Sequence, residues 1–527
     1  MKYKRLTSIL LVLVLVVSSI CINDSDNVKA ANNEQNANSW KNSAITAPVQ
    51  DSLIGAGYID IKWNNNLENV AKYDVYIDGK YIKTLNASSS AQMSYEMYTT
   101  GVSAHYACLV ATLKNGSKVQ TATRRFFVTK KGLCVNTRDM GTAVDPASMN
   151  IGWYYNWGYK SFKDIMEDPE SSIKFNNHKF DNVEFVPMVW GEPSVEFSNI
   201  FAHTKSKGYK YMLAYNEPDL KWESNVSPST MLLRWNYEFI PNKGNMRLGS
   251  PATSVFQTWS DWWPTYWNGL SAASKNNMSF IAVHSYQKSY SGAKSALEYL
   301  QGIDEIYETY HKPIWLTEFA FWKFDKNDKA GCAKVQEFMK IVCKGLNERK
   351  YVERYSWFCP DINSTDASSS SIFDYKTGAL TPIGKIYAQI GNPAGYRART
   401  YGAPSYCGVN TSPEACAVAM KTTLYRAKAK KRAFSYAIKY VSKAAGYELQ
   451  YSQSKKFKKA KKYHTKTKIV KGKEVNTISG KVKIPKKYLK KKKKTTTYYV
   501  RVRAYKILDG KKLYCAWSSK IKTKIKR

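Results

Sequence analysis

Two glutamates follow apolar stretches of this chain in the same way. The stretch "YMLAYNEPD" is apolar over residues 211–215 and then presents Asn216 and Glu217. The stretch "IWLTEFA" is apolar over residues 314–316 and presents Glu318 after one threonine. Two carboxyl groups that end buried strands and face each other can act as general acid and nucleophile. Taken singly, each glutamate is equally compatible with a buried ion pair or an exposed charge at a strand end.

The elements that would position these glutamates are short apolar strands, separated by longer helical or loop stretches. There are about eight strands over roughly 260 residues, which is the pattern of a (β/α)8 barrel, an α/β fold. The predicted strands are Gly132–Asn136, Ile151–Trp157, Val183–Gly191, Tyr211–Pro218, Arg247–Ala252, Phe280–Tyr286, Ile314–Ala320 and Arg354–Pro360. We therefore predict a TIM barrel over residues 131–392.

In such a barrel the working residues lie where strands end and the following loops begin. Glu217 then ends the fourth strand and Glu318 the seventh, on opposite walls of one cleft. Retaining hydrolysis of a glycosidic bond needs this arrangement, with two carboxyl groups about 5–5.5 Å apart. Asn216 is placed to hydrogen-bond a substrate hydroxyl beside the reacting centre, a bond that strengthens in the transition state. This favours Glu217 as acid/base and Glu318 as nucleophile.

Six motifs occur in order on the predicted strands: "WYYNW", "FVPMVWG", "YNEPD", "VHSY", "WLTEFA" and "YSWF". Together they resemble glycoside hydrolase family 128, the Asl1-like endo-β-1,3-glucanases of clan A of the glycoside hydrolases. The resemblance covers Lys131–Asn392 and implies a retaining barrel enzyme that acts on β-1,3-glucan. One departure is "HSY", where the family pattern has a bulkier middle residue, so the floor of the cleft is expected to differ.

Further residues at the predicted strand ends would surround a bound sugar. His284 or Tyr286 would hydrogen-bond the nucleophile and keep it ionised, and aromatic rings would stack on glucose rings. The predicted substrate-binding residues are Asn216, His284, Tyr286, Trp153, Tyr155, Asn156, Trp190 and Trp357. For the tryptophans, a place in the barrel core is a serious alternative, and His284 has the alternative of a satisfied core histidine. Asp219 is either a substrate contact or a helix cap.

Alternating runs with Asp-Gly and Asn-Gly turns lie on both sides of the predicted barrel. Residues 47–130 and 421–527 each resemble a fibronectin type III β-sandwich. Residues 1–30 have a basic head, an apolar run and small residues near Ala30, which predicts a secretory signal peptide. Residues 31–46 are predicted to be a flexible segment and residues 393–420 a linker.

Charge and cysteine content add two expectations. The net charge is +40, and residues 421–527 hold 37 lysines and arginines against three acids. This basic surface favours a solvated module or one that holds an anionic cell-wall polymer; a nucleic-acid-binding role rests on charge alone and is not expected. Eight cysteines follow the leader; Cys407 and Cys416 are the most plausible local disulfide pair, and buried free thiols are an equally plausible alternative.

The sequence therefore predicts a secreted or wall-associated monomer that hydrolyses β-1,3-glucan. No phosphate loop, dinucleotide fingerprint or metal-ligand spacing occurs in it, so no cofactor and no metal are expected. Two alternatives stay open: a non-catalytic carbohydrate-binding or wall-attachment protein on a barrel scaffold, and a clan A glycosidase for another β-glycan.

Overall fold

The structure is a computed structural model that describes most of the chain. The described residues are 39–136, 143–173, 176–254, 261–290, 292–359, 361–363, 366–398, 422–441, 444–466, 477–490, 494–508 and 511–526. The predicted leader and the proposed Cys407–Cys416 pair lie outside these ranges. No helix among the described residues is long and apolar enough to cross a membrane.

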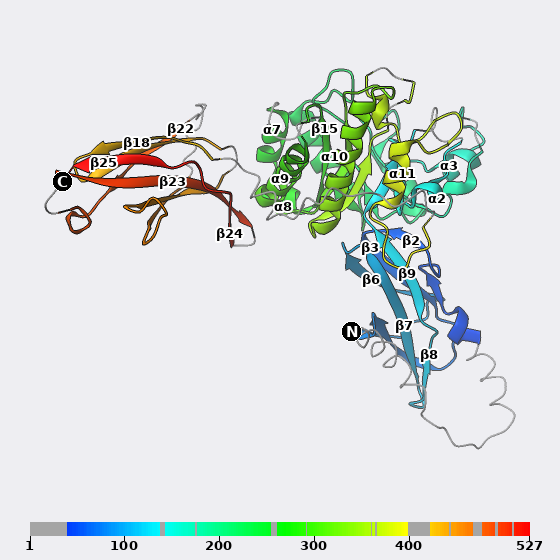
Figure 1. The fold of residues 1–527 in the computed structure, drawn as a ribbon. Helices are drawn as coiled ribbons and strands as arrows, with labels where there is room; N and C mark the ends of the chain where they lie inside the picture. The colour runs from blue at the N-terminus through cyan, green and yellow to red at the C-terminus, as the bar shows by residue number, and fades with distance from the viewer. Residues whose placement is uncertain are drawn as a thin grey trace, which may run out of the picture. The chain divides into compact units, whose positions relative to one another are not determined.

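The middle of the chain is a TIM-barrel-like α/β fold with all eight predicted strands in place (Figure 1). The strands are β10 (Lys131–Cys134), β11 (Trp153–Tyr155), β12 (Glu184–Phe185), β13 (Tyr211–Met212), β14 (Arg247–Gly249), β15 (Met278–Gln287), β16 (Ile314–Phe321) and β17 (Val352–Trp357). They form one parallel sheet in the order β12-β11-β10-β17-β16-β15-β14-β13. A parallel bridge between Met188 and Leu213 joins the chain after β12 to the chain after β13, so the two ends of the sheet meet.

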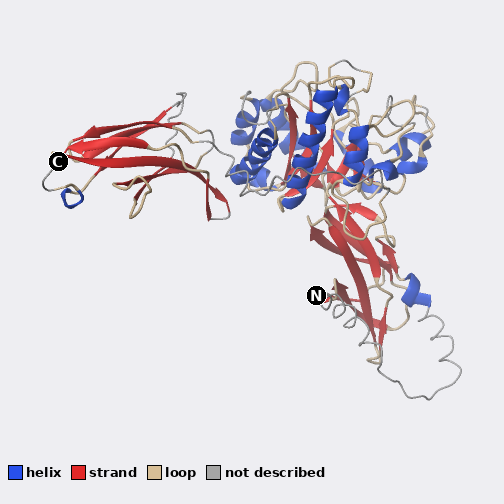
Figure 2. Ribbon diagram, viewed as in Figure 1, coloured by secondary structure: helices blue, strands red, loops and turns tan. Residues whose placement is uncertain are grey.

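Helices surround these strands, as Figure 2 shows in blue around red. They are α2 (Pro146–Met149), α3 (Phe162–Glu167), α4 (Phe197–Ser206), α5 (Pro228–Arg234), α6 (Ile240–Asn242), α7 (Trp262–Gly269), α8 (Ala272–Asn276), α9 (Ala293–Tyr310), α10 (Lys329–Glu348) and α11 (Pro382–Gln389), with a π-helical turn η2 (Trp235–Phe239) between α5 and α6. The long helices α9 and α10 turn apolar faces toward the sheet: Leu300, Ile303, Phe338 and Val342 are buried. The strands are thus covered on both faces, which is why β16 is buried at every position.

Two apolar clusters divide the barrel's core. The outer cluster fills the space between the strands and the helices and includes Tyr154, Phe319 and Trp357. The inner cluster fills the barrel itself and includes Cys134, Trp153, Tyr155, Met188, Tyr211, Phe280 and Trp315. Successive residues of a strand point to opposite faces, so Trp153 and Tyr155 enter the inner cluster while Tyr154 enters the outer one.

The N-terminal β-module contains two sheets. One has the order β1 (Ile45–Ala47), β3 (Gly57–Asn64), β6 (Gln92–Thr99). The other has the order β2 (Leu53–Gly55), β9 (Arg124–Thr129), β7 (Ser103–Leu113), β4 (Val70–Ile77), β5 (Lys80–Asn86), with β8 (Lys118–Gln120) paired to β7. The predicted Asp-Gly hairpin joins β4 to β5: Asp78 and Gly79 both have positive φ, at 52° and 74°, as this tight turn requires.

The C-terminal module also consists of two sheets. One is β18 (Leu424–Lys430), β19 (Ala433–Lys439), β22 (Thr477–Lys483). The other is β21 (Lys461–Lys466), β20 (Gly446–Ser452), β23 (Thr495–Leu508), β24 (Lys511–Tyr514), with β25 (Ile521–Lys526) paired to β23. Both sheets bury residues in one core that includes Phe434, Leu449 and Val502. The assignment of both flanking modules to the fibronectin type III family stays a prediction, and so do the predicted domain boundaries.

One buried charge inside the barrel links several strands. The Arg354 guanidinium on β17 lies over the rings of Trp153, Tyr211 and Trp315, at 4.4–5.4 Å from their centroids. It bonds to the Glu184 carboxylate on β12 at 2.8 Å, and its side chain is 0% exposed. A buried cation is tolerated only when it is paired and hydrogen-bonded, and here one carboxylate and three aromatic faces meet that demand.

Replacing Arg354 with leucine should lower the free energy of unfolding by about 2–4 kcal/mol, because Glu184 loses its partner and the three rings lose their cation. Denaturant unfolding followed by tryptophan fluorescence measures the loss. The matched control is Lys294→Ala, which breaks the half-exposed pair with Glu298 and should cost less than about 0.5 kcal/mol. Equal small losses in both variants would contradict a structural role for the Arg354 pair.

Candidate active site

Glu217 lies where the chain leaves the fourth strand of the barrel. After β13 the chain stays beside the next strand: Asn216 forms a parallel bridge with Ala252, and the Glu217 N–H donates to the Ala252 carbonyl at 2.7 Å. Glu217 has φ of 40°, in the left-handed region that side chains other than glycine rarely adopt. Such a conformation persists only where the surroundings impose it, and it turns this carboxylate away from the direction of the strand.

Glu318 and His284 lie side by side on neighbouring strands. Glu318 belongs to β16 and His284 to β15, and the parallel register pairs the two residues directly. An irregularity in the ladder between Val283 and His284 shifts the register there. A bulge of this kind re-aims a side chain, and the two side chains consequently reach the same space.

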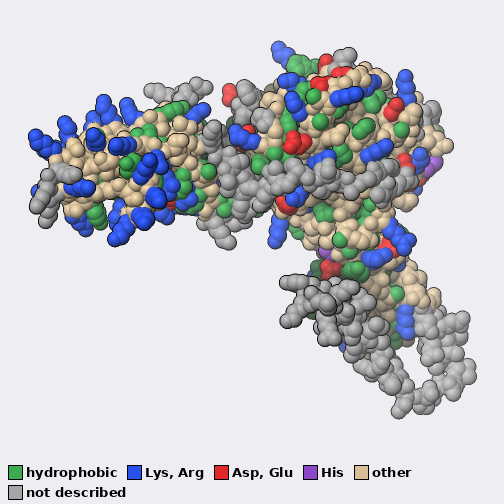
Figure 3. All heavy atoms as spheres, viewed as in Figure 1, with side chains coloured by type: hydrophobic (Ala, Val, Ile, Leu, Met, Phe, Trp, Pro, Cys, Tyr) green, Lys and Arg blue, Asp and Glu red, His purple; other side chains and the backbone are tan. Residues whose placement is uncertain are grey.

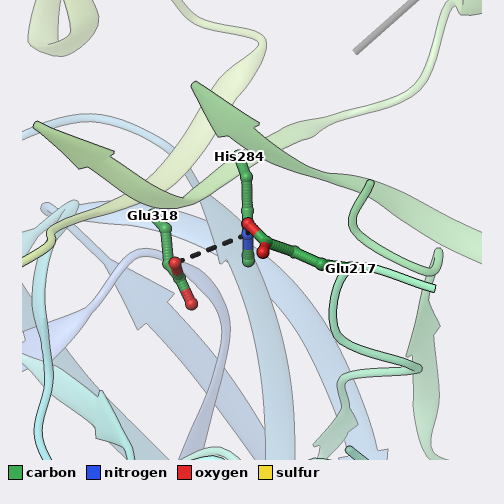
Figure 4. Close-up of side chains that lie close together, drawn as sticks. All are labelled: Glu217, His284 and Glu318. Atoms are coloured by element: carbon green, nitrogen blue, oxygen red, sulfur yellow. Dashed lines mark hydrogen bonds and ion pairs between the residues drawn. The ribbon is translucent and has the colours of Figure 1, made fainter. Parts of the chain in front are cut away.

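The imidazole of His284 contacts both carboxylates (Figure 4). Its Nδ1 lies 2.9 Å from Glu217 Oε1 and 3.5 Å from Glu318 Oε2. One oxygen of each glutamate and one nitrogen of the histidine all lie within 4.8 Å of one another. Exposure is 9% for Glu217, 4% for Glu318 and 0% for His284. The two glutamates therefore meet at one site, as their positions in the sequence predict.

Three side chains donate hydrogen bonds to Glu318. Trp157 Nε1 and the Tyr155 hydroxyl donate to Oε1, at 2.9 and 3.2 Å, and the Tyr286 hydroxyl donates to Oε2. Trp157 also has a positive φ, 59°, so two residues of the site hold unusual backbone conformations. Hydrogen bonds to the charged form of a carboxyl group favour that form, so this environment stabilises Glu318 as a carboxylate.

Burial and the charges of the two carboxylates shift the pKa values of the neighbouring residues His284, Tyr286 and Tyr155. Burial alone would lower the pKa of His284, but the charges of Glu318 and Glu217 outweigh it and raise that pKa above its ordinary value. The imidazole is therefore protonated over a wider pH range, which reduces the repulsion between the two glutamates. Burial, and then the charge of Glu318, raise the pKa of Tyr286 and of Tyr155, so both hydroxyls keep the proton that they donate.

Asn216 is held by a carboxylate that sequence reasoning missed. Its Nδ2 donates to Glu223 Oε2 at 3.2 Å. Burial and the charges of Glu217 and Glu318 raise the pKa of Glu223. The Glu223 contact occupies the amide nitrogen of Asn216 and fixes the orientation of the amide. The buried Oδ1 of Asn216 has no hydrogen-bond partner among the described residues. That oxygen can accept a hydrogen bond from a bound hydroxyl. Glu223 lies in the loop after the strand, and no motif marked it.

Two predicted stacking residues lie in the core instead. Trp153 and Trp357 are both 0% exposed. Trp153 Nε1 donates to the Lys130 carbonyl at 3.0 Å inside the barrel, and Trp357 Nε1 donates to the Ser370 carbonyl at 2.8 Å on the helix side. A ring without an exposed face cannot stack on a sugar, so the predicted substrate contact was wrong for both, and the alternative of barrel core holds.

The remaining predicted residues differ in their surroundings. Trp190 is 40% exposed and its carbonyl accepts from the Asn216 N–H at 2.8 Å, so its backbone lies beside the site. Asn156 uses its side chain within its own loop, on Gly158 and Lys160. Asp219 accepts one hydrogen bond from the Ser254 backbone N–H and one from the Ser254 hydroxyl. It does not cap α5, whose N-cap is Ser227, and its role as a substrate contact stays a prediction.

The same three groups have the types and spacing of metal ligands. Two carboxylates and an imidazole within 4.8 Å can hold a divalent ion such as zinc. However, both oxygens of Glu318 already accept from N–H or O–H donors whose hydrogens face the site. Those hydrogens would repel a cation, so the surroundings favour proton transfer over metal binding.

Comparison with known proteins identifies the barrel's relatives. Residues 132–387 match the family model described as "Glycosyl hydrolase catalytic core". The alkali-sensitive linkage protein 1 of Schizosaccharomyces pombe is 27% identical over 267 residues, which are 49% of this chain and 44% of that protein. The match thus spans less than half of that relative's length. The resemblance to Asl1-like glycoside hydrolases predicted from the motifs is confirmed for this part of the chain.

Solved structures of family 128 enzymes also match. An endo-β-1,3-glucanase of Amycolatopsis mediterranei, in complex with laminaritriose and laminaribiose, is 27% identical, with 50% of this chain and 99% of that chain covered and a TM-score of 0.39. An exo-β-1,3-glucanase of Cryptococcus neoformans is 22% identical, with 50% and 99% covered and a TM-score of 0.37.

Metal analysis tests the preference for proton transfer. We expect the purified protein to contain far less than one equivalent of zinc or other divalent metal, and its thermal unfolding midpoint to be unchanged by excess EDTA, because N–H and O–H donors already contact both Glu318 oxygens. Elemental analysis and calorimetry measure both. A stoichiometric metal that is lost in a Glu318→Gln variant would contradict this assignment.

Proposed function

We propose that this protein is a retaining endo-β-1,3-glucanase. The observation that carries the proposal is the meeting of Glu217 and Glu318, each with one oxygen within 4.8 Å of the other, at the carboxyl ends of two barrel strands. Retaining glycosidases hold their carboxyl groups about 5–5.5 Å apart, whereas inverting enzymes need about 6.5–9.5 Å to admit a water molecule. The short separation here supports double displacement.

Glu318 is the nucleophile in this proposal. Three donors, Tyr155, Trp157 and Tyr286, stabilise its carboxylate form, and a nucleophilic carboxylate has to be ionised when substrate binds. Glu318 attacks the anomeric carbon and forms a glycosyl ester as the bond to the leaving oxygen breaks. The fixed hydrogen bonds orient the attacking oxygen before the substrate arrives.

Glu217 is the acid/base. It has fewer hydrogen-bond donors than Glu318: the contact with His284 at 2.9 Å is its side-chain hydrogen bond among the described residues. It gives a proton to the leaving oxygen in the first step and takes one from water in the second, so the product keeps the configuration of the substrate. His284 contacts both glutamates and is therefore a positioning residue for both.

The substrate class rests on the six motifs and on the matching family. Family 128 enzymes are the group whose motifs this barrel repeats in order, and their substrate is β-1,3-glucan. Asn216 Oδ1, buried and open to a hydroxyl donor, suits a sugar hydroxyl beside the anomeric centre. The exposed ring of Trp190 suits a glucose face in a neighbouring position. Secretion by the predicted leader would bring the enzyme to an extracellular polymer.

A panel of polysaccharides tests the substrate class. We expect reducing sugar to be released from laminarin and curdlan, and none from cellulose or xylan, because the motifs are those of β-1,3-glucanases. The Glu318→Ala variant, which leaves the fold intact as judged by circular dichroism, should lose at least about a thousandfold in kcat. Release from cellulose or xylan, with laminarin untouched, would assign the barrel to another β-glycan. Inactivity on all four would favour the non-catalytic carbohydrate-binding alternative.

The two roles are separated by activated substrates and azide. On laminarin, Glu217→Ala should lose roughly the 10²–10⁴-fold rate acceleration that a general acid contributes. On an aryl glucoside, whose leaving group needs no proton, the loss of rate should be much smaller. Added azide should then give the β-glycosyl azide, since the nucleophile is intact. The matched variant Glu318→Ala should give the α-azide or no product. Nuclear magnetic resonance identifies the anomer, and the reverse pattern would exchange the two assignments.

A further inference from the structure

Cations and aromatic rings alternate on one sheet of the C-terminal module. Arg501 on β23 lies 4.1 Å from the centroid of Phe457 and 4.4 Å from that of Trp517. Arg503, two residues along the same strand face, lies 4.4 Å from the centroid of Trp517 and 3.9 Å from that of Tyr514. We refer to these five residues as the cation ladder. Both guanidiniums are held rigidly by the rings they contact.

The two arginines differ in how their charge is balanced. Arg503 pairs with Glu448 at 2.9 Å, and His464 and Lys462 share that same carboxylate. Arg501 bonds to the neutral amide oxygen of Gln450 at 2.8 Å, and no carboxylate pairs with it among the residues that the structure describes. Burial and the neighbouring charge of Arg503 lower the pKa of Arg501. The Arg501 end of the cation ladder therefore carries a partly exposed positive charge that no carboxylate among the described residues compensates.

A hollow lies at that end of the ladder. Its volume is about 480 Å³, and Lys455, Lys456 and Lys520 line it together with Arg501, Phe457 and Trp517. Phe457 has φ of 57°, in the left-handed region that bulky side chains rarely adopt. This strained turn presents the Phe457 ring to Arg501 and places two lysines beside it. Figure 3 shows further Lys and Arg side chains gathered over this module.

The chemistry of the hollow selects against two ligand classes. Neutral sugars and single-stranded nucleic acids bind aromatic platforms with open faces. Here guanidiniums cover the rings of Phe457 and Trp517. What the hollow offers is one planar, preorganised guanidinium and three flexible ammonium groups, a set that matches phosphate groups. A repeating anion also matches the basic surface beyond the hollow.

We propose that this hollow binds a phosphodiester polymer without bases, of the polyol-phosphate type found in bacterial cell walls. Arg501 binds one phosphate, Lys455, Lys456 and Lys520 bind it and its neighbours, and the basic face of the module attracts the rest of the chain. This inference goes beyond the proposed hydrolysis of glucan: it gives the C-terminal module a ligand of its own, which would retain the enzyme on an anionic surface.

Binding of poly(glycerol phosphate) by the full-length protein tests the inference. Isothermal titration should show binding that weakens steeply with salt, because phosphate contacts release counterions. The triple variant Lys455→Glu, Lys456→Glu, Lys520→Glu should weaken it by about tenfold or more. The matched control Lys428→Glu, Lys481→Glu, Lys483→Glu makes the same charge change at exposed lysines of the other sheet and should change affinity less than about threefold.

Three results would overturn the inference. Equal losses in the two triple variants would assign binding to the overall charge of the module and not to the hollow. Tighter binding of a single-stranded oligonucleotide than of the polymer would make it a nucleic-acid site. Absence of polymer binding at low salt would remove the site altogether. All six lysines are exposed, and thermal unfolding checks that each variant folds; laminarin hydrolysis should be unchanged in both, which separates this test from the proposed catalysis.

Discussion

The site depends on keeping two carboxylates close together in a place that water barely reaches. Like charges at this separation repel, and burial strengthens the repulsion. Groups of opposite polarity from β15, from β11 and from the residues that follow β11 offset this repulsion: the His284 imidazole, which contacts both carboxylates, and the donors Tyr155, Trp157 and Tyr286 on Glu318. Because these donors are unequally shared, the two carboxylates have different surroundings, and such an inequality would suit the proposed division into nucleophile and acid/base.

Backbone strain is the second part of this arrangement. Glu217 and Trp157 both hold positive φ, and both point a polar atom at the centre of the site. Neither residue would adopt this conformation in a free chain, so the free energy of burial elsewhere in the barrel maintains it. The inner cluster, with Arg354 held between three rings and Glu184, fills the barrel below the site and provides a rigid floor. The site's precision is thus a property of the whole barrel.

The order of the strands and the two glutamates could be predicted from sequence, because apolar runs and polar strand ends are local patterns. The direction of a side chain could not. On β17, Arg354 turns into the barrel and Trp357 turns out to the helices. Both faces of β17 are buried, and the polar residues Glu353, Arg354 and Ser356 lie among its apolar ones, so no apolar/polar alternation marks the inward face. Trp153 and Tyr155 lie on the same inward face of β11, and the sequence does not show that Tyr155 reaches Glu318 while Trp153 bonds to the Lys130 carbonyl. Glu223 was missed because its contact with Asn216 depends on how a loop closes.

The same pairing of guanidinium and aromatic ring has different consequences in the two parts of the chain. In the barrel, Arg354 lies over three rings and is neutralised by Glu184, so its charge stabilises the barrel and is not available to a ligand. In the C-terminal module, Arg503 is neutralised by Glu448 in a comparable way, while Arg501, which also lies over Trp517, has no carboxylate partner among the described residues. A partly exposed arginine that contacts rings but no described carboxylate keeps its positive charge for an anionic ligand. The proposed ligand would supply the negative charge that Arg501 lacks among the described residues.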